Sequence, residues 1–427
     1  MKAKNIILGG GFAGLQLASL LNDSIIIEAS PSVGGLLKSF KSDSGQFTFD
    51  IGGHVYTTKD ELLSDIMHDS NPNYFAERKA YYDYQRQIPY PIQYHADELG
   101  IKLMHTPSER PPSLASLLIH EFGQEFYEKV LGPFNRRVWS TSPSQMDTDW
   151  IDGRIAKISE FGNNWGTNSS FYYACGEDIL ETMKARLRLT GTRIFTDSSV
   201  IDIKPNDKEL YVDCVFPAVY KGTITYEHLF DTTGMLLNMN DQILPHNDVL
   251  TIGIGLNRKL DVDFHWWYNS VENTSPIHRI TLLSRYSEKL APDGVDSLLI
   301  EIPYKNYNNR DIYESENDNE YFSRIGVLSL LRRANFNFID DSSIEEIVKI
   351  RSKGYPIPVI THRTKVAIAR KNYAENCAYL VGRWGAHGYY NLDHIIHDAI
   401  SAVSASHNEK VEDYYWANHY YKEKRRF

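Results

Sequence analysis

The chain opens with Ile6-Ile7-Leu8-Gly9-Gly10-Gly11-Phe12-Ala13-Gly14, an apolar run that leads into closely spaced glycines. The apolar residues predict a buried strand, and the leucine-rich residues after the glycines predict a helix. Gly9 permits a tight turn, Gly11 allows backbone amides to approach a pyrophosphate, and Gly14 allows the helix to pack closely on the strand. Ser24-Ile25-Ile26-Ile27-Glu28 predicts a second strand that ends in an acid, where a carboxylate can accept hydrogen bonds from a ribose. The pattern predicts a Rossmann-like dinucleotide-binding unit with the phosphates at the helix N-terminus; a glycine-rich turn in an ordinary α/β unit is the alternative.

Composition limits the classes of protein to consider. With 427 residues, of which 42% are hydrophobic, the chain can form two or three domains with their own cores. No apolar run approaches the roughly 18 residues that a membrane span needs. Cys175, Cys214 and Cys377 are widely spaced and show no metal-ligand pattern, so we expect free thiols in a cytoplasmic protein without a metal. The net charge of −10 argues against nucleic acid as a partner.

The residue pattern changes by region and predicts a cofactor domain that is discontinuous in sequence. Apolar residues spaced four apart predict a helical lobe with Ser113 as the N-cap; they are Leu114, Leu118, Phe122, Phe126 and Val130. Short strands are predicted at 193–195 and 210–215, and strands dominate to about Pro303. A buried strand at 377–382 and a helix over 392–403 complete the pattern.

Two further glycine pairs indicate which dinucleotide is bound. Val33-Gly34-Gly35-Leu36 and Phe49-Asp50-Ile51-Gly52-Gly53-His54 allow backbone to approach a large flat ligand. This order resembles the flavoprotein superfamily that includes amine oxidases, protoporphyrinogen oxidases and UDP-galactopyranose mutases, and the resemblance implies FAD as the cofactor. The cofactor-binding residues that it implies are Gly9, Gly11, Phe12, Ala13, Gly14, Glu28, Ala29, Gly34, Gly35, Leu36, Gly53, His54, Gly382, Arg383, Asn391 and Leu392.

Six ordered blocks narrow the resemblance to the UDP-galactopyranose mutase family. They are Ile88–Gln93, Pro133–Trp139, Trp150–Ala156, His278–Thr281, Tyr355–Pro358 and Gly382–Gly385. Arg279 and the segment 284–287 resemble the eukaryotic-type branch more closely than the bacterial one. The family implies an α/β fold with a Rossmann-like FAD-binding domain, an inserted helical domain and an antiparallel-sheet substrate domain. We expect FAD-binding parts at 1–95, 191–245 and 361–427, a helical domain at 96–190 and a substrate-side sheet domain at 246–360.

The family resemblance also implies a reaction and its residues. UDP-galactopyranose and UDP-galactofuranose would interconvert through a covalent adduct of reduced flavin and sugar, with NADPH or NADH as an expected reductant and a homo-oligomer left open. The catalytic residues implied are Arg154, Arg279, Arg383 and His54. The substrate-binding residues implied are Tyr90, Gln93, Asn135, Trp139, Tyr268, Tyr355, Tyr389 and Asn391. Guanidinium groups suit a diphosphate because they offer paired, planar donors; surface ion pairs for the arginines and a core position for Trp139 are the alternatives.

Some positions depart from the family pattern and leave the base and the sugar open. Ile92 replaces an aromatic residue, which would weaken base stacking, and His387-Gly388 replaces an aromatic-arginine pair. A mutase for another nucleotide hexose is therefore a close alternative. A flavin oxidase or dehydrogenase of the amine oxidase type, and a flavin-binding protein without catalysis, are the alternatives of other classes.

Overall fold

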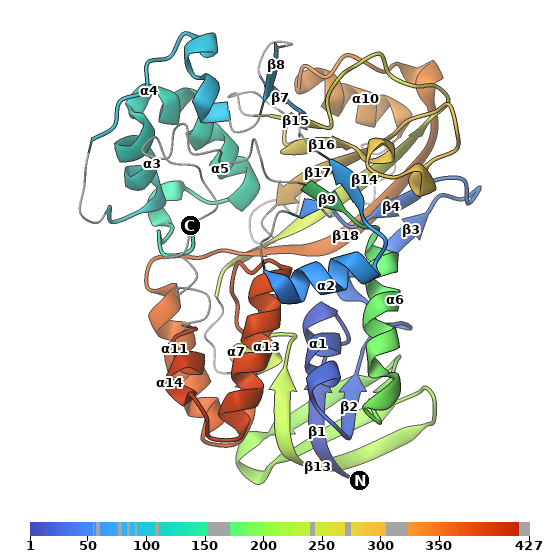
Figure 1. Cartoon of the computed structure of the whole chain (residues 1–427), viewed down its shortest axis with the longest axis vertical. Coiled ribbons are helices and arrows are strands. Elements are labelled where there is room, and N and C mark those ends of the chain that lie inside the picture. The colour runs from blue at the N-terminus through green and yellow to red at the C-terminus, as the bar shows by residue number, and fades with distance from the viewer. Residues whose placement is uncertain are drawn as a thin grey trace.

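The computed structural model describes residues 1–53, 55–56, 60–75, 79–82, 86–89, 92–106, 111–151, 171–239, 244–269, 275–304 and 323–417. A parallel sheet with helices on both faces forms one half of the molecule, and an antiparallel sheet and a helical lobe form the other (Figure 1). Among these residues, no helix combines the length and the apolar character that crossing a membrane requires.

Strands from three separate parts of the sequence build the parallel sheet. The parallel strands lie in the order β10 (Arg193–Phe195), β2 (Ser24–Ile27), β1 (Lys2–Leu8), β13 (Tyr220–Asp231) and β19 (Ala378–Leu380). An antiparallel hairpin of β11 (Ser199–Lys204) and β12 (Glu209–Cys214) pairs with the first half of β13. Ile6 and Ile7 on β1 are both fully buried, although their side chains point to opposite faces. The sheet is therefore covered on both sides, as continuous apolar runs predict.

Helices pack around this sheet. They are α1 (Phe12–Leu20), α2 (Glu61–Asp69), α6 (Gly176–Arg186), α7 (Met235–Met239), α11 (His362–Ala374), α12 (Gly382–Gly385), α13 (Leu392–Ser406) and α14 (Val411–Tyr415). Helix α1 contacts α6 and α13, and α2 lies across the junction between the two halves (Figure 1).

The antiparallel sheet lies above the parallel-sheet half in the view of Figure 1. Its order is β18 (Ile344–Pro356), β14 (His246–Leu256), β17 (Ser297–Tyr304), β16 (Arg279–Leu282), β15 (Trp266–Tyr268), β7 (Lys79–Tyr82) and β8 (Arg86–Pro89), with β7 parallel to β15. Helix α10 (Arg324–Arg333) packs its buried leucines on this sheet. On β14, a Cβ at Gly253 would stand 2.6 Å from the Phe49 ring, and one at Gly255 would stand 2.5 Å from the Phe47 ring. These two glycines allow β4 (Thr48–Asp50) to pack against the antiparallel sheet. Asp50 at the end of β4 also accepts a hydrogen bond from the Gly176 N–H on α6, so the segment before Gly52-Gly53 contacts both halves.

The helical lobe contains α3 (Leu114–Phe122), α4 (Gln124–Phe126), a π-helical turn (Tyr127–Leu131) and α5 (Gly132–Trp139). The Ser113 side chain accepts a hydrogen bond from the Ser116 N–H, which confirms the predicted N-cap. Every residue of the predicted apolar stripe is buried, but the helix is not continuous because Gly123 adopts a φ of +89°.

Three short strands and a hairpin complete the described fold: β3 (Ser39–Lys41) pairs with β4, and β9 (Phe171–Tyr173) pairs with β5 (Val55–Tyr56) and β6 (Asn73–Phe75). The Rossmann-like α/β fold class with a separate antiparallel sheet is confirmed. The domain boundaries stay a prediction.

Candidate functional site

The glycine turn between β1 and α1 has the geometry that a dinucleotide requires. Gly9 has a φ of +91°, and its N–H donates to the Ile27 carbonyl at 2.9 Å. A Cβ at Gly14 would stand 2.0 Å from the Gly9 oxygen, so only glycine fits there. A Cβ at Gly11 would meet nothing nearer than the Gly35 Cα at 3.8 Å, so the space over the turn is open. No side chain caps α1 and no acid lies in its first turn, which leaves its N-terminal N–H groups to an anion.

Glu28 lies beside this turn at the end of β2. Its carboxylate accepts hydrogen bonds from the Gly10 N–H at 2.7 Å, the Ser30 N–H at 2.9 Å and the Ser30 hydroxyl at 2.6 Å. The Gly34 N–H donates to the Gly10 carbonyl at 2.8 Å and brings the second glycine pair to the first. Because a carboxylate offers about four acceptor positions, Glu28 keeps capacity for a ribose hydroxyl.

The segment that begins at Gly382 packs against α1. A Cβ at Gly382, where φ is +79°, would stand 2.6 Å from the Ala13 Cβ. The Gly382 N–H donates to Asp398 at 2.7 Å, and Asp398 pairs with Arg370 at 2.6 Å; both charged side chains are fully buried. Because Gly382 directly precedes Arg383, this pair fixes the backbone of the predicted Arg383 beside the glycine turn.

Asn391 and Leu392 mark the start of α13 near the same turn. Asn391 is the N-cap residue, and its N–H donates to His394 Nδ1 at 3.3 Å. Since α13 packs on α1, the predicted cofactor residues of the first and last thirds of the chain come together.

A row of polar side chains crosses the antiparallel sheet. Tyr268, Arg279 and Glu301 are direct neighbours on β15, β16 and β17. The Arg279 guanidinium donates twice to Glu301, through Nε to Oε2 and through Nη2 to Oε1 at 3.0 Å. Burial alone would lower the pKa of Arg279, but Glu301 outweighs it and the pKa stays well above its usual range. Glu301 therefore holds Arg279 in a fixed orientation, and the guanidinium stays charged.

The cofactor-side loop approaches this row. A Cβ at Gly52 would stand 3.6 Å from a Glu301 carboxylate oxygen, and one at Gly53 would stand 3.8 Å from the Thr281 hydroxyl. The Thr281 hydroxyl is buried and has no hydrogen-bond partner within the described part of the chain. A polar atom that can serve a ligand thus lies where the two halves meet.

Aromatic side chains from four segments form a wall beside the row. The Trp139 ring lies 4.8 Å from Tyr389, 5.8 Å from Tyr355 and 4.9 Å from Trp150, measured between ring centroids. Trp139 is buried, and its indole N–H donates to Asn135 Oδ1 at 3.2 Å. Both predicted residues therefore stabilise each other inside the wall.

Two arginines from different parts of the chain act electrostatically on Tyr355. The Arg383 guanidinium carbon lies 5.7 Å from the Tyr355 ring centroid, and Arg383 donates twice to the Tyr390 carbonyl, at 3.0 and 2.7 Å. Burial, and next Glu301, raise the pKa of the Tyr355 phenol, whereas Arg279 and Arg383 both act to lower it. The phenol thus stays protonated and lies in the field of both guanidinium groups.

Sequence reasoning missed three buried carboxylates of the site: Glu301, Asp398 and Asp50. Asp50 accepts hydrogen bonds from the hydroxyls of Ser39 at 2.5 Å and Tyr173 at 2.6 Å. In the sequence, the sign that Asp50 belongs to the site is its position two residues before Gly52.

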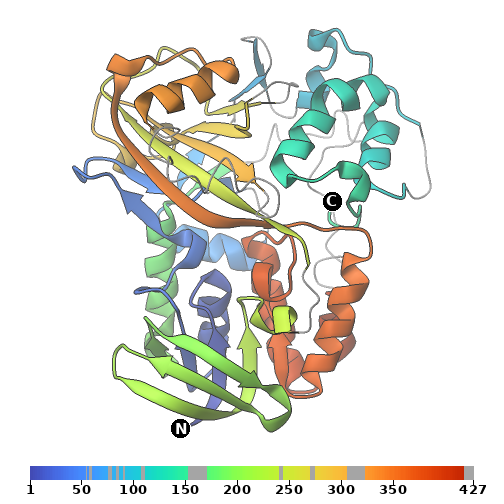
Figure 2. The same cartoon turned by 180° about the vertical axis from the view of Figure 1, so that it is seen from behind.

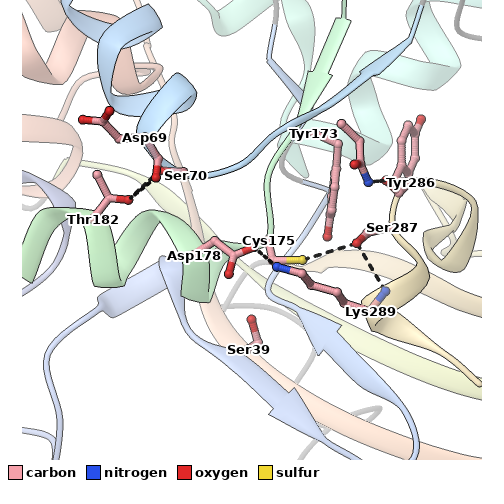
Figure 3. A network of polar contacts seen from close by, with 12 residues as sticks. Ser39, Asp69, Ser70, Tyr173, Cys175, Asp178, Thr182, Tyr286, Ser287 and Lys289 are labelled. Atoms are coloured by element: carbon pink, nitrogen blue, oxygen red, sulfur yellow. Dashed lines mark hydrogen bonds and ion pairs between the residues drawn. The ribbon is translucent and has the colours of Figure 1, made fainter.

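The polar network around Tyr173 ties α6 and β9 to the segment between β16 and β17 (Figure 3). Tyr173 stacks on Tyr286 with 5.3 Å between ring centroids, and Lys289 pairs with Asp178 at 3.0 Å.

Not every predicted residue can be placed. Arg154, His54 and Tyr90 lie outside the described residues. Gln93 is buried in a 3-10 turn (Ile92–His95), and Ala29 is exposed beside Glu28.

Comparisons with known proteins address the fold. Residues 7–70 match the family described as an NAD(P)-binding Rossmann-like domain. The crystal structure of a reduced UDP-galactopyranose mutase superimposes with a TM-score of 0.80 at 22% identity, over 97% of each chain. The chain shares that fold. No curated protein matches the sequence.

Two other solved structures align less closely. A candidate protoporphyrinogen oxidase from Exiguobacterium sp. 255-15 has a TM-score of 0.70 at 15% identity, over 95% of this chain and 99% of the other. A putrescine oxidase has a TM-score of 0.61 at 13% identity with the same coverage. The fold expected from the resemblance is confirmed, and the assignment to the eukaryotic-type branch stays a prediction.

Proposed function

We propose that the chain is an FAD-dependent UDP-galactopyranose mutase that interconverts UDP-galactopyranose and UDP-galactofuranose. The proposal rests on two guanidinium groups that both act on the Tyr355 phenol: Arg383 lies over its ring, and Arg279 pairs with Glu301 beside Gly52. Two guanidinium groups suit a nucleotide diphosphate, whereas oxidation of an amine has no use for them.

The residues around the glycine turn fit FAD. The N-terminus of α1 would hold the pyrophosphate, Glu28 would hold a ribose, and Gly52-Gly53 and Gly382-Arg383 would leave room for the ring system. When bound and reduced, FAD would supply the nucleophile for the anomeric carbon of the sugar.

The chain's own residues would handle charge and water. Arg279 and Arg383 would stabilise the negative charge that gathers on the departing diphosphate, and Glu301 would keep Arg279 in a fixed orientation. The phenols of Tyr355 and Tyr389 would donate hydrogen bonds to the diphosphate without adding charge. The aromatic wall around Trp139 would exclude water from the sugar.

The remaining expectations belong to the same proposal. We infer a nicotinamide dinucleotide as reductant, which would use the nucleotide-sugar cleft, and a cytoplasmic enzyme that can form a homo-oligomer. Another nucleotide hexose is the nearest alternative substrate, because Ile92 and His387-Gly388 depart from the family pattern.

The test compares matched arginine substitutions. FAD-loaded protein is reduced with dithionite, and conversion of UDP-galactofuranose is followed by chromatography for wild type, Arg279→Lys and Arg258→Lys. Arg258 donates to the Phe338 carbonyl at 3.1 Å and to Ser343 at 3.3 Å, so it serves as the control. We expect Arg279→Lys to lower turnover about a hundredfold, since a two-pronged contact is lost, and Arg258→Lys to retain it. Equal turnover of both variants would remove Arg279 from the site. Oxygen consumption with an amine in place of conversion would favour the oxidase alternative.

A further inference from the structure

A lysine and a cysteine from distant parts of the chain meet at the edge of the parallel sheet. Lys208 Nζ lies 3.1 Å from Cys377 Sγ, although 169 positions separate the residues. Lys208 precedes β12 and Cys377 precedes β19, and both have left-handed backbone, with φ of 52° and 56°. The N–H groups of Tyr226 and Leu229 on β13 donate to the Lys208 and Cys377 carbonyls, each at 3.0 Å. The neighbouring strand therefore holds both residues in place.

The lysine has no competing partner in the described ranges. Lys208 forms no ion pair with a carboxylate there, and the thiol of Cys377 is its side-chain hydrogen-bond partner. The thiolate is the nucleophilic form of a cysteine, and Lys208 Nζ lies where it can donate a hydrogen bond to the sulfur.

The other two cysteines differ from Cys377 in their surroundings. Cys175 and Cys214 are buried, whereas Cys377 is half-exposed. Burial raises the pKa of Cys175 to about 11 and also raises that of Cys214, so both stay as inert thiols. The chain therefore holds two internal controls for any chemistry at Cys377.

A buried hydroxyl without a partner in the described part of the chain also lies near Cys377. Tyr226 is 4% exposed, and its hydroxyl has no hydrogen-bond partner within the described part of the chain. Burial, and after it the nearby Cys377, raise the pKa of Tyr226, so the phenol stays protonated close to the sulfur. Such a phenol can donate a hydrogen bond to an oxygen atom that is added to the sulfur.

We propose that Cys377 is a peroxide-sensitive site whose oxidised sulfur is captured by Lys208 in a reversible sulfur-nitrogen bond. The Cys377 thiolate attacks hydrogen peroxide, the oxygen-oxygen bond breaks, and the sulfur becomes a sulfenic acid while the departing hydroxide takes a proton from Lys208 and leaves as water. The neutral Lys208 amine then attacks the sulfur and displaces a second water. The sulfur loses two electrons, the peroxide gains them, and the side chains together lose two hydrogen atoms.

The cross-link would join two loops far from the glycine turn. Cys377 lies at the start of β19, whereas the turn lies at the carboxyl ends of the parallel strands. The hairpin that carries Lys208 is drawn in green at the bottom of Figure 2, away from the antiparallel sheet. The proposal is thus independent of the proposed reaction.

The experiment treats the full chain with hydrogen peroxide, digests it with trypsin and analyses the peptides by mass spectrometry. We expect a species that joins the peptides of Lys208 and Cys377, lacks cleavage after Lys208, and disappears with dithiothreitol. Lys208→Met should remove the cross-link and slow the loss of the free Cys377 thiol about tenfold. Tyr226→Phe should also slow it. The matched control is Lys204→Met, an exposed lysine on the same hairpin, which should behave as wild type.

Three results would overturn the proposal. The first is oxidation of Cys377 no faster than that of Cys214 at the same peroxide concentration. The second is equal cross-linking in Lys208→Met, Lys204→Met and wild type. The third is only irreversible oxidation of Cys377 without a link to Lys208.

Discussion

Removal of one charge from the buried pair Arg370–Asp398 should destabilise the protein strongly. Asp398 accepts from Arg370 at 2.6 Å and from the Gly382 N–H at 2.7 Å, and both charged side chains have no solvent exposure. Asp398→Asn keeps the shape but leaves the guanidinium without its counter-charge, a change that costs about 3–5 kcal/mol when the pair is buried. The single amide oxygen of Asn can accept a hydrogen bond from the Gly382 N–H or from the Arg370 guanidinium, whereas the carboxylate accepts from both. We therefore expect the free energy of unfolding to fall by about 4 kcal/mol.

The assay is equilibrium unfolding in urea at pH 7, followed by tryptophan fluorescence. Asp69→Asn is the matched control, because Asp69 pairs with Arg186 at 3.1 Å while their side chains are 55% and 34% exposed. An exposed pair of this kind contributes at most about 1 kcal/mol. Replacement of both buried partners, as Arg370→Met with Asp398→Leu, should restore only part of the lost stability, because the buried Gly382 N–H loses its acceptor.

A loss below about 1 kcal/mol for Asp398→Asn, or a loss no larger than that of Asp69→Asn, would refute this reasoning. Such a result would mean that the pair does not hold Gly382 and Arg383 in place.

Four further changes have defined outcomes. Gly14→Ala should abolish FAD retention, measured by absorbance, because the new Cβ would stand 2.0 Å from the Gly9 oxygen. Arg383→Ala should retain FAD but lose conversion, and normal turnover would remove Arg383 from the catalytic residues. Ile92→Phe should tighten binding of a uridine nucleotide in calorimetry through base stacking, and an unchanged affinity would mean that the base lies elsewhere. Burial, followed by His362, lowers the pKa of His387 to about 3, so its neutral form stabilises the fold above about pH 6.5 and this stability is lost as the pH falls towards 3. Asparagine suits the local φ of 48°. Between pH 7 and pH 5, the free energy of unfolding in urea should therefore fall by about 2 kcal/mol less in His387→Asn than in wild type.

The parts of the fold that the sequence predicted depend on local patterns. The glycine turn, the strand before Glu28 and the helix capped by Ser113 follow from the spacing of neighbouring residues, and each is present. The break at Gly123 was not predicted because the apolar spacing continues unchanged through it.

The buried carboxylates of the site could not be predicted in the same way. Glu301 meets Arg279 through strand pairing, and Asp398 meets Arg370 through helix packing, so no short motif contains either pair. A charged residue in an apolar strand or helix gives no sign of its partner, because burial and partner both depend on the tertiary fold.

In the proposed function, reduced FAD on this chain supports sugar-ring isomerisation. The most direct measurement is anaerobic conversion of UDP-galactofuranose into UDP-galactopyranose by the FAD-loaded protein, assayed by chromatography with and without dithionite. We predict conversion with the reduced cofactor and none with the oxidised one. Retained FAD without conversion in either state would contradict the claim.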